Sequence, residues 1–115
     1  MEWLNGPMTQ SLNSQYNPPM AQKLDDSQIA QNLSKLKGWT RTGNEIRKTL
    51  SFKNFYETMS FVNAVAHIAN QLDHHPDMEV GYNKLTIRFS THSVGGLSEN
   101  DFVAAGKIDR LEDRG

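Results

Sequence analysis

Apolar residues recur along this chain at two different spacings, and the changes between them predict the order of the elements. Stripes at intervals of three and four residues indicate helices, and strict alternation indicates half-buried strands. The elements are expected over residues 26–37 (helix), 39–52 (hairpin), 54–72 (helix), 77–91 (hairpin) and 98–114 (helix). The pattern therefore predicts an α+β domain in the order α-β-β-α-β-β-α.

Residues that favour particular backbone conformations lie between these elements. Gly38 is expected to stop the first helix in the left-handed region, and Gly43-Asn44 to form the first hairpin turn. Asn83 suits a turn position with positive φ in the second hairpin. Lys48 interrupts the apolar alternation of its strand, and the pattern alone gives no reason for it.

The N-terminal part of the chain has a different composition. Asn, Gln, Ser and Pro dominate its first 22 residues, and Pro18-Pro19 forms a stiff, non-helical spacer near the end. The few apolar residues there follow neither a helical nor a strand period. We therefore expect residues 1–22 to be a disordered N-terminal extension and residues 23–115 to form a single domain.

Composition and charge narrow the classes of function. A length of 115 residues suits one domain, and a formal net charge of −1 argues against a nucleic-acid-binding module. The absence of cysteine excludes disulfides, thiolate zinc sites and cysteine nucleophiles. No apolar run approaches the roughly 20 residues of a membrane span, and no secretory signal is visible. We expect a cytoplasmic protein without a nucleic-acid or membrane partner.

Three of the four histidines fall at one end of the second predicted hairpin. A two-residue turn at Tyr82-Asn83 puts the apolar side chains of this hairpin on one face, so the apolar pattern determines the register. Pro76 has no N–H to donate and is expected to end the ladder. Extending the register brings together four side chains at the open end of the hairpin: Asp73, His74, His75 and His92.

The parity of the last strand predicts the direction of one of these histidines. His92 lies on the face opposite the apolar residues, so we expect it to point away from the core. The fourth histidine, His67, lies away from the apolar stripe of its helix and is expected to be exposed and outside the site.

Two chemistries compete for such a cluster. Histidine gives and takes protons near neutral pH, which favours metal-free acid–base catalysis. Three imidazoles also suit zinc, but adjacent histidines rarely point at one ion, and HxH and HExxH spacings are absent, so we expect no metal. Structural roles compete as well, because a histidine pair at a helix end and a hydrogen-bonded histidine at a strand end are both ordinary.

The segment from His74 to Phe102 resembles the signature of the pterin-4a-carbinolamine dehydratases. The shared residues are His74-His75-Pro76, Tyr82-Asn83-Lys84, Ser90-Thr91-His92, Gly96-Leu97-Ser98 and Asp101. A looser similarity extends over residues 23–111 and leaves out the N-terminal extension. Two positions depart from the pattern: Asn70 stands where many relatives carry an acidic residue, and Met78 where some carry Trp.

The resemblance implies a fold and a reaction. The fold would be a four-stranded antiparallel sheet with three helices on one face, in the element order that the hydrophobic pattern predicts independently. The reaction would be dehydration of a 4a-hydroxytetrahydropterin to the quinonoid dihydropterin, without metal or organic cofactor. The enzyme, a hydro-lyase, would support tetrahydrobiopterin recycling for aromatic amino acid hydroxylases.

The resemblance also implies roles for single residues. His74 and His92 would be the acid–base pair, and His75 would mainly hold and polarise the pterin. Asp101 would orient or charge-tune His92, would cap the last helix, or would do both. The residues expected to bind the substrate are Asp73, His74, His75, Pro76, Thr91, His92, Ser93 and Val94.

A non-catalytic function is the alternative. Animal members of the family stabilise dimers of a homeodomain transcription factor, so this chain would then be a binding or regulatory protein, with nuclear localisation. An apolar, exposed helix face formed by Phe61, Ile68 and Leu72 would favour that function. The resemblance further implies a homodimer or homotetramer and a hydroxylase or transcription factor as protein partner.

Overall fold

A computed structural model describes residues 21–114 of the chain and confirms the predicted order of helices and strands. A short 3₁₀ helix is added between the last strand and the last helix. The elements are α1 (Asp26–Leu33), β1 (Thr40–Thr42), β2 (Glu45–Ser51), α2 (Phe55–Leu72), β3 (Asp77–Val80), β4 (Lys84–Phe89), η2 (His92–Val94) and α3 (Glu99–Arg114). The predicted N-terminal extension lies almost wholly outside the described residues.

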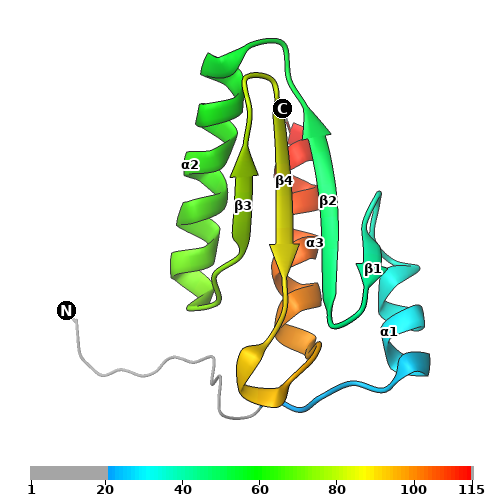
Figure 1. Cartoon of the computed structure of the whole chain (residues 1–115). Helices are drawn as coiled ribbons and strands as arrows, with labels where there is room; N and C mark the ends of the chain where they lie inside the picture. Colours follow the sequence, from blue (N-terminus) through cyan, green and yellow to red (C-terminus); the bar gives the residue numbers. More distant parts are fainter. Residues whose placement is uncertain (1–20, 115) are drawn as a thin grey trace, which may run out of the picture.

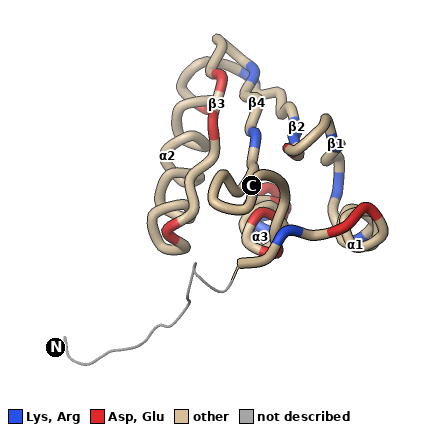
Figure 2. The backbone as a smooth tube through the Cα atoms, turned by 60° about the horizontal axis from the view of Figure 1, so that its bottom comes forward, with Lys and Arg blue, Asp and Glu red and all other residues tan. Residues whose placement is uncertain are grey.

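The four strands form one antiparallel sheet in the order β1-β2-β4-β3. Helix α3 runs behind the two central strands, α2 lies beside β3, and α1 lies beside β1 (Figure 1). Seen from the end in Figure 2, the strands form one layer, and the three helices all lie on one side of it. The α+β fold with a four-stranded sheet and three helices is therefore confirmed.

The hydrophobic core lies between the sheet and the helices. Alternate residues of β2 and β4 are buried there, and Val65 of α2 and Ile108 of α3 pack against them. Removing each such side chain from water contributes about 1.5–3 kcal/mol. On the opposite face of the sheet, the hydroxyls of Thr49 and Thr86 lie 2.8 Å apart on neighbouring strands. Alternation thus gives the sheet one apolar and one polar face, as the sequence predicts.

Helix α1 is shorter than its apolar stripe suggests. A capping box between Asp25 and Gln28 stabilises its first turn, but the helix ends at Leu33 rather than at Lys37. The N–H groups of Lys35 and Leu36 bond to carbonyls three residues back. The N–H of Lys37 leaves the helix pattern and donates to the carboxylate of Asp109 on α3. A tertiary hydrogen bond therefore ends the helix before Gly38, which has the expected left-handed φ of 77°.

The register of the second hairpin is the predicted one. Val80 pairs with Leu85 and Met78 with Ile87, and the ladder ends at Asp77, directly after Pro76. In the first hairpin, Thr42 pairs with Glu45 across the expected Gly43-Asn44 turn. Turn length and apolar alternation together are enough to set both registers.

The prediction of a positive φ at Asn83 is wrong. Within residues 21–114 the one non-glycine residue with positive φ is Asp73. The carbonyl of Asn83 accepts from the N–H of Phe52, and the carbonyl of Tyr82 accepts from the hydroxyl of Thr58. These contacts with the residue after β2 and with α2 hold the turn in a conformation that its own sequence does not specify.

Lys48 interrupts the apolar alternation of β2 because it forms a buried ion pair. Its side chain is 8% exposed, and its ammonium lies 3.0 Å from Asp109 and 2.6 Å from Glu112, both on α3. A buried charge is tolerated when it is paired and hydrogen-bonded. The polar residue on the apolar face is therefore a link between the sheet and α3.

The apolar helix face that would favour a purely regulatory protein is largely used inside the domain. Phe61, Ile68 and Leu72 are half-buried and pack against the core, so the exposed patch expected in that alternative does not form. In the part of the chain that the structure describes, no helix combines the length and the apolar character needed to cross a membrane.

Candidate active site

The end of α2 positions the two adjacent histidines. Asp73 adopts a left-handed conformation with φ 51°, and its N–H bonds to the carbonyl of Asn70. The N–H of His74 bonds to the carbonyl of Ala69, five residues back. These two bonds form a Schellman motif, in which glycine is the commoner left-handed residue. The chain therefore turns sharply at Asp73, and His74 and His75 leave the helix toward the end of β4.

His74 is held from two sides. Its ring stacks on Phe89 of β4, with centroids 5.7 Å apart and planes inclined by 10°. Its Nε2 lies 2.6 Å from Oδ1 of Asp101 on α3. Because a carboxylate oxygen only accepts, Nε2 carries a proton and donates it, and Nδ1 is the nitrogen left for other partners.

Asp101 is the polar centre behind the histidines. It is fully buried, and its second oxygen accepts from the hydroxyl of Thr91 at 2.8 Å and from the N–H of Ser98 at 3.0 Å. The Ser98 bond confirms the expected capping contact at the start of α3. The expectation that Asp101 orients His92 is corrected: its imidazole partner is His74, because α3 passes behind β4 and brings the carboxylate to the His74 side.

His75 has a neutral partner instead of a carboxylate. Its Nε2 lies 2.9 Å from Oδ1 of Asn70, one turn back on α2. An amide oxygen accepts without adding charge, so this bond orients the ring and requires a proton on Nε2. The departure from the family pattern at Asn70 is therefore in direct contact with a histidine of the candidate site.

His92 is held by its backbone alone. Thr91 and Gly96 pair across a tight loop, and Gly95, with φ 69°, closes the 3₁₀ helix by donating to the carbonyl of His92. His92 is exposed, as expected, but it begins η2 rather than continuing β4, which ends at Phe89. Its ring has no hydrogen-bond partner among residues 21–114. Both ring nitrogens of His92 are therefore available to a ligand.

The three histidines line one cavity of about 320 Å³ at the end of the second hairpin. The predicted site residues that line it are Asp73, His74, His75, Thr91, His92 and Ser93. Asp101 lies behind His74, whereas Pro76 and Val94 are not among the lining residues. Ser90 and Asn100 complete the lining and were not expected. Ser90 belongs to the Ser-Thr-His motif, which is a signal in the sequence, whereas nothing in the sequence singled out Asn100.

The histidine cluster does not form a metal site with neighbouring acidic groups. Within residues 21–114, no group of three or more His, Cys, Asp or Glu side chains has an arrangement that would hold a metal ion. His67, the fourth histidine, is exposed on α2 as expected and does not line the cavity.

Two solved structures resemble this fold. A transcriptional coactivator/pterin dehydratase from Brucella melitensis superposes with a TM-score of 0.75 at 31% identity, covering 77% of this chain and 97% of that one. A pterin dehydratase-like protein, described as a RuBisCO assembly factor in the alpha-carboxysome, has a TM-score of 0.53. It is 20% identical and covers 64% of this chain and 84% of its own, so it supports the fold alone.

Sequence comparison agrees with the structural one. A protein of Nitrosospira multiformis named as a pterin-4-alpha-carbinolamine dehydratase is 54% identical, over 82% of this chain and 80% of its own length. One of Sulfolobus acidocaldarius with the same name is 44% identical, over 78% of this chain and 99% of its own. The family model described as Pterin 4 alpha carbinolamine dehydratase matches residues 22–111. The chain therefore belongs to the pterin-4a-carbinolamine dehydratases, a family of hydro-lyases.

Proposed function

We propose that this protein dehydrates a 4a-hydroxytetrahydropterin to the quinonoid dihydropterin and water by metal-free histidine acid–base catalysis. The observation that carries the proposal is the cavity that His74, His75 and His92 line together, with Asp101 bonded to His74. In cells this activity would return the pterin oxidised by aromatic amino acid hydroxylases to the tetrahydrobiopterin cycle.

The reaction needs one proton delivered and one removed. The bond between C4a and the hydroxyl oxygen breaks, and a general acid protonates the departing oxygen so that it leaves as water. A general base takes the proton from N5, and the electron pair of that N–H bond forms the new double bond between N5 and C4a. Positioned imidazoles contribute about 10²–10⁴-fold to each such transfer.

The three histidine rings have different partners, and we assign them different roles accordingly. The buried carboxylate of Asp101 supplies a counter-charge beside His74, so we assign the acid to His74. His92 has both nitrogens open to the cavity and would take the N5 proton. His75, oriented by the neutral amide of Asn70, would hold the pterin. We also propose that the pterin contacts Asp73, Pro76, Thr91, Ser93 and Val94. We include Ser90 and Asn100 because they line the same cavity.

A direct assay tests the proposed activity. A pterin-dependent hydroxylase generates the 4a-hydroxytetrahydropterin in situ, and absorbance follows formation of the quinonoid product with and without the protein. We expect acceleration over buffer, reduced about 10²–10⁴-fold in His74→Ala and in His92→Ala. His67→Ala removes an exposed histidine outside the cavity and should leave the rate unchanged. Folded wild-type protein that gives no acceleration would refute the proposal.

Self-assembly and protein partners stay predictions. A homodimer or homotetramer would appear by light scattering at a multiple of 13.0 kDa. A pull-down with a hydroxylase or a homeodomain transcription factor would test the partners that the family resemblance implies.

A further inference from the structure

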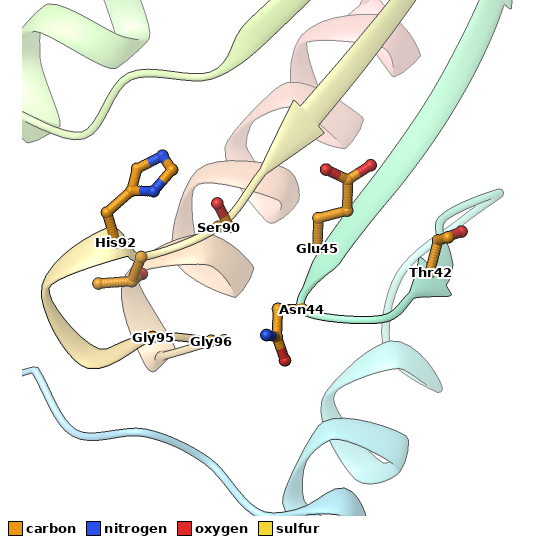
Figure 3. A pocket seen from close by; sticks show the side chains of 8 residues that line it. Thr42, Asn44, Glu45, Ser90, His92, Gly95 and Gly96 are labelled. Atoms are coloured by element: carbon orange, nitrogen blue, oxygen red, sulfur yellow. The ribbon is translucent and has the colours of Figure 1, made fainter.

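A larger cavity than that of the histidines lies at the opposite end of the sheet. The cavity drawn in Figure 3 shares Ser90, Thr91 and His92 with the histidine cavity, so it belongs to the candidate active site. Its other wall includes the turn that carries Glu45. The larger cavity, of about 670 Å³, lies where β2 ends, α2 begins and α3 ends (Figure 1). Its volume falls within the roughly 300–1,000 Å³ of small-molecule sites.

Aromatic and aliphatic side chains form the floor of this larger cavity. The rings of Phe52 and Phe61 pack against each other, with centroids 5.3 Å apart and planes inclined by 42°. Both are half-buried against the core, whereas Tyr56 at the rim is 81% exposed. Aromatic rings prefer such tilted contacts with one another, so the cavity suits a ligand with an aromatic ring. The remaining apolar lining residues are Leu50, Ala64 and Leu111.

Two oppositely charged side chains of this cavity form no ion pair within residues 21–114. Glu57 belongs to α2, and its Oε1 accepts from the N–H of Lys53 at 3.1 Å, which leaves Oε2 without a partner in this range. Arg114, in the last turn of α3, likewise has no acidic partner there. The third charged group, Glu112, is already paired with Lys48 at 2.6 Å. The cavity therefore offers a ligand one carboxylate oxygen and one guanidinium.

Helix periodicity explains why these groups line one cavity. Glu57, Ser60 and Ala64 recur on α2 at intervals of three and four residues, so they lie on one stripe of that helix. Leu111 and Arg114, three residues apart, share a stripe of α3. Both stripes line the cavity, so its carboxylate and its guanidinium come from different walls. A ligand with one positive and one negative group can then contact both helices at once.

We propose that this cavity is a second ligand site, for a zwitterionic amino acid with an aromatic side chain. The guanidinium of Arg114 donates to the ligand carboxylate, for which its planar fork is suited. The carboxylate of Glu57 accepts from the ligand ammonium. The ligand ring packs against Phe52, Phe61 and Tyr56. A water occupies about 30 Å³ of liquid volume, so about a dozen heavy atoms fit within 670 Å³. The site is independent of the dehydration proposed above.

An NMR titration of the isotope-labelled full chain with L-phenylalanine tests the site. We expect saturable shifts at lining residues from both helices, such as Ser60, Ala64 and Leu111. The dissociation constant should be on the order of 1 mM, because so small a ligand makes few contacts. Amide signals around the histidine cavity, at the other end of the sheet, should not shift.

Two analogues of phenylalanine each lack one charged group. Phenethylamine has no carboxylate, and hydrocinnamate has no ammonium. Each should bind about fivefold more weakly than phenylalanine, because an exposed ion pair contributes at most about that factor.

Charge-removing variants should lose one of these preferences each. Arg114→Gln should bind phenylalanine and phenethylamine about equally and keep the preference for phenylalanine over hydrocinnamate. Glu57→Gln should show the reverse, because it removes the partner of the ammonium alone. Arg110→Gln is the matched control: Arg110 lies one turn earlier on α3, is also exposed and does not line this cavity, so both preferences should stay unchanged. Thermal unfolding of each variant checks that its fold is intact.

Several outcomes would overturn this site. They are the absence of saturable shifts at the lining residues, equal affinity for phenylalanine and both analogues, and variants that weaken all of these probes alike. Shifts of the same residues on dilution without ligand would show that a second copy of the chain covers the cavity, and would overturn the site as well. The dehydration assay is a separate measurement at the histidines, so its failure would leave this site in place.

Discussion

Helix α3 carries two buried aspartates eight positions apart, and they differ in the group that compensates their charge. Asp101 is fully buried and Asp109 is 7% exposed, and each accepts three hydrogen bonds. The donors to Asp101 are His74, Thr91 and Ser98. The donors to Asp109 are the N–H of Lys37, the indole of Trp39 and the ammonium of Lys48. By burial and number of bonds alone, the two carboxylates look alike.

Their cationic partners distinguish them. Burial lowers the pKa of Lys48, but its hydrogen bonds with Glu112 and Asp109 outweigh this and hold the pKa above the ordinary 10.5. Asp109 is therefore paired with an ammonium group that stays charged, and this ion pair links α3 to β2. Asp101 faces an imidazole that lines an open cavity and can exchange its proton with a ligand. The partner of a buried carboxylate, and the access of that partner to solvent, therefore indicate whether the carboxylate serves catalysis or stability.

The largest expected effect is on activity, in Asp101→Asn. If the amide oxygen keeps the bonds from Thr91 and Ser98, the amide NH₂ faces His74 and forces its Nε2 to accept, so the ring changes tautomer. The same substitution in a Ser-His-Asp triad lowers kcat about 10⁴-fold, and we expect a loss of about 10³–10⁴-fold here. Steady-state kinetics with the 4a-hydroxy substrate measures it. A loss below tenfold in a folded variant would contradict the role given to Asp101.

Asp109→Ala should affect stability instead. It leaves the buried ammonium of Lys48 with Glu112 as its remaining acidic partner and removes the acceptor of the Trp39 indole. Breaking a buried pair costs about 3–5 kcal/mol of unfolding free energy, measurable by urea denaturation. Activity per folded molecule should stay at the wild-type value.

A double variant serves as the control for Asp109→Ala. Lys48→Met together with Asp109→Leu replaces the pair by apolar groups and should recover part of the lost stability. A double variant less stable than Asp109→Ala would show that charge compensation is not what Asp109 provides.

Two glycine substitutions compare the loop that packs against Lys48 with the loop that carries His92. Gly38 and Gly95 both have positive φ, so alanine costs about 1–2 kcal/mol at either position. At Gly38 the new Cβ would also lie 3.2 Å from Cε of Lys48, whereas at Gly95 it meets open space. Gly38→Ala should therefore destabilise the fold more than Gly95→Ala in denaturant titrations. Equal losses of stability would mean that the Lys48 side chain moves away from the new Cβ at no cost in free energy.

The smallest expected effect is in the pH dependence of stability. Because the pKa of Lys48 is raised in the folded protein, its contribution is fully present below pH 10.5 and is lost as pH rises through the folded pKa. The unfolding free energy of the wild type should therefore fall more steeply above that pH than that of Lys48→Met. Urea titrations between pH 8 and about 11.5 measure the two slopes, and parallel slopes would contradict the assignment.

The second hairpin shows how far local pattern goes. Its register follows from alternation and turn length and predicts that His74 and His75 lie near His92. The left-handed turn at Asp73, at the end of α2, completes this placement. The end of α1 and the turn at Asn83 were predicted wrongly because tertiary bonds from Asp109, Phe52 and Thr58 override the local preference. At an element boundary, alternative backbone conformations differ little in free energy, so one long-range hydrogen bond is enough to reverse the preference.

By itself, the sequence determined the order of elements, the faces of the strands and the end of the sheet at which the histidines meet. These depend on periodicity, which acts over a few residues. Only the tertiary structure decided that Asp101 bonds to His74 rather than to His92, that Asn70 bonds to His75, and that the turn carrying Glu45 adjoins the histidine cavity. Such pairings depend on how α3 crosses behind the sheet and how the two hairpins lie side by side, and the spacing of residues along the chain contains neither.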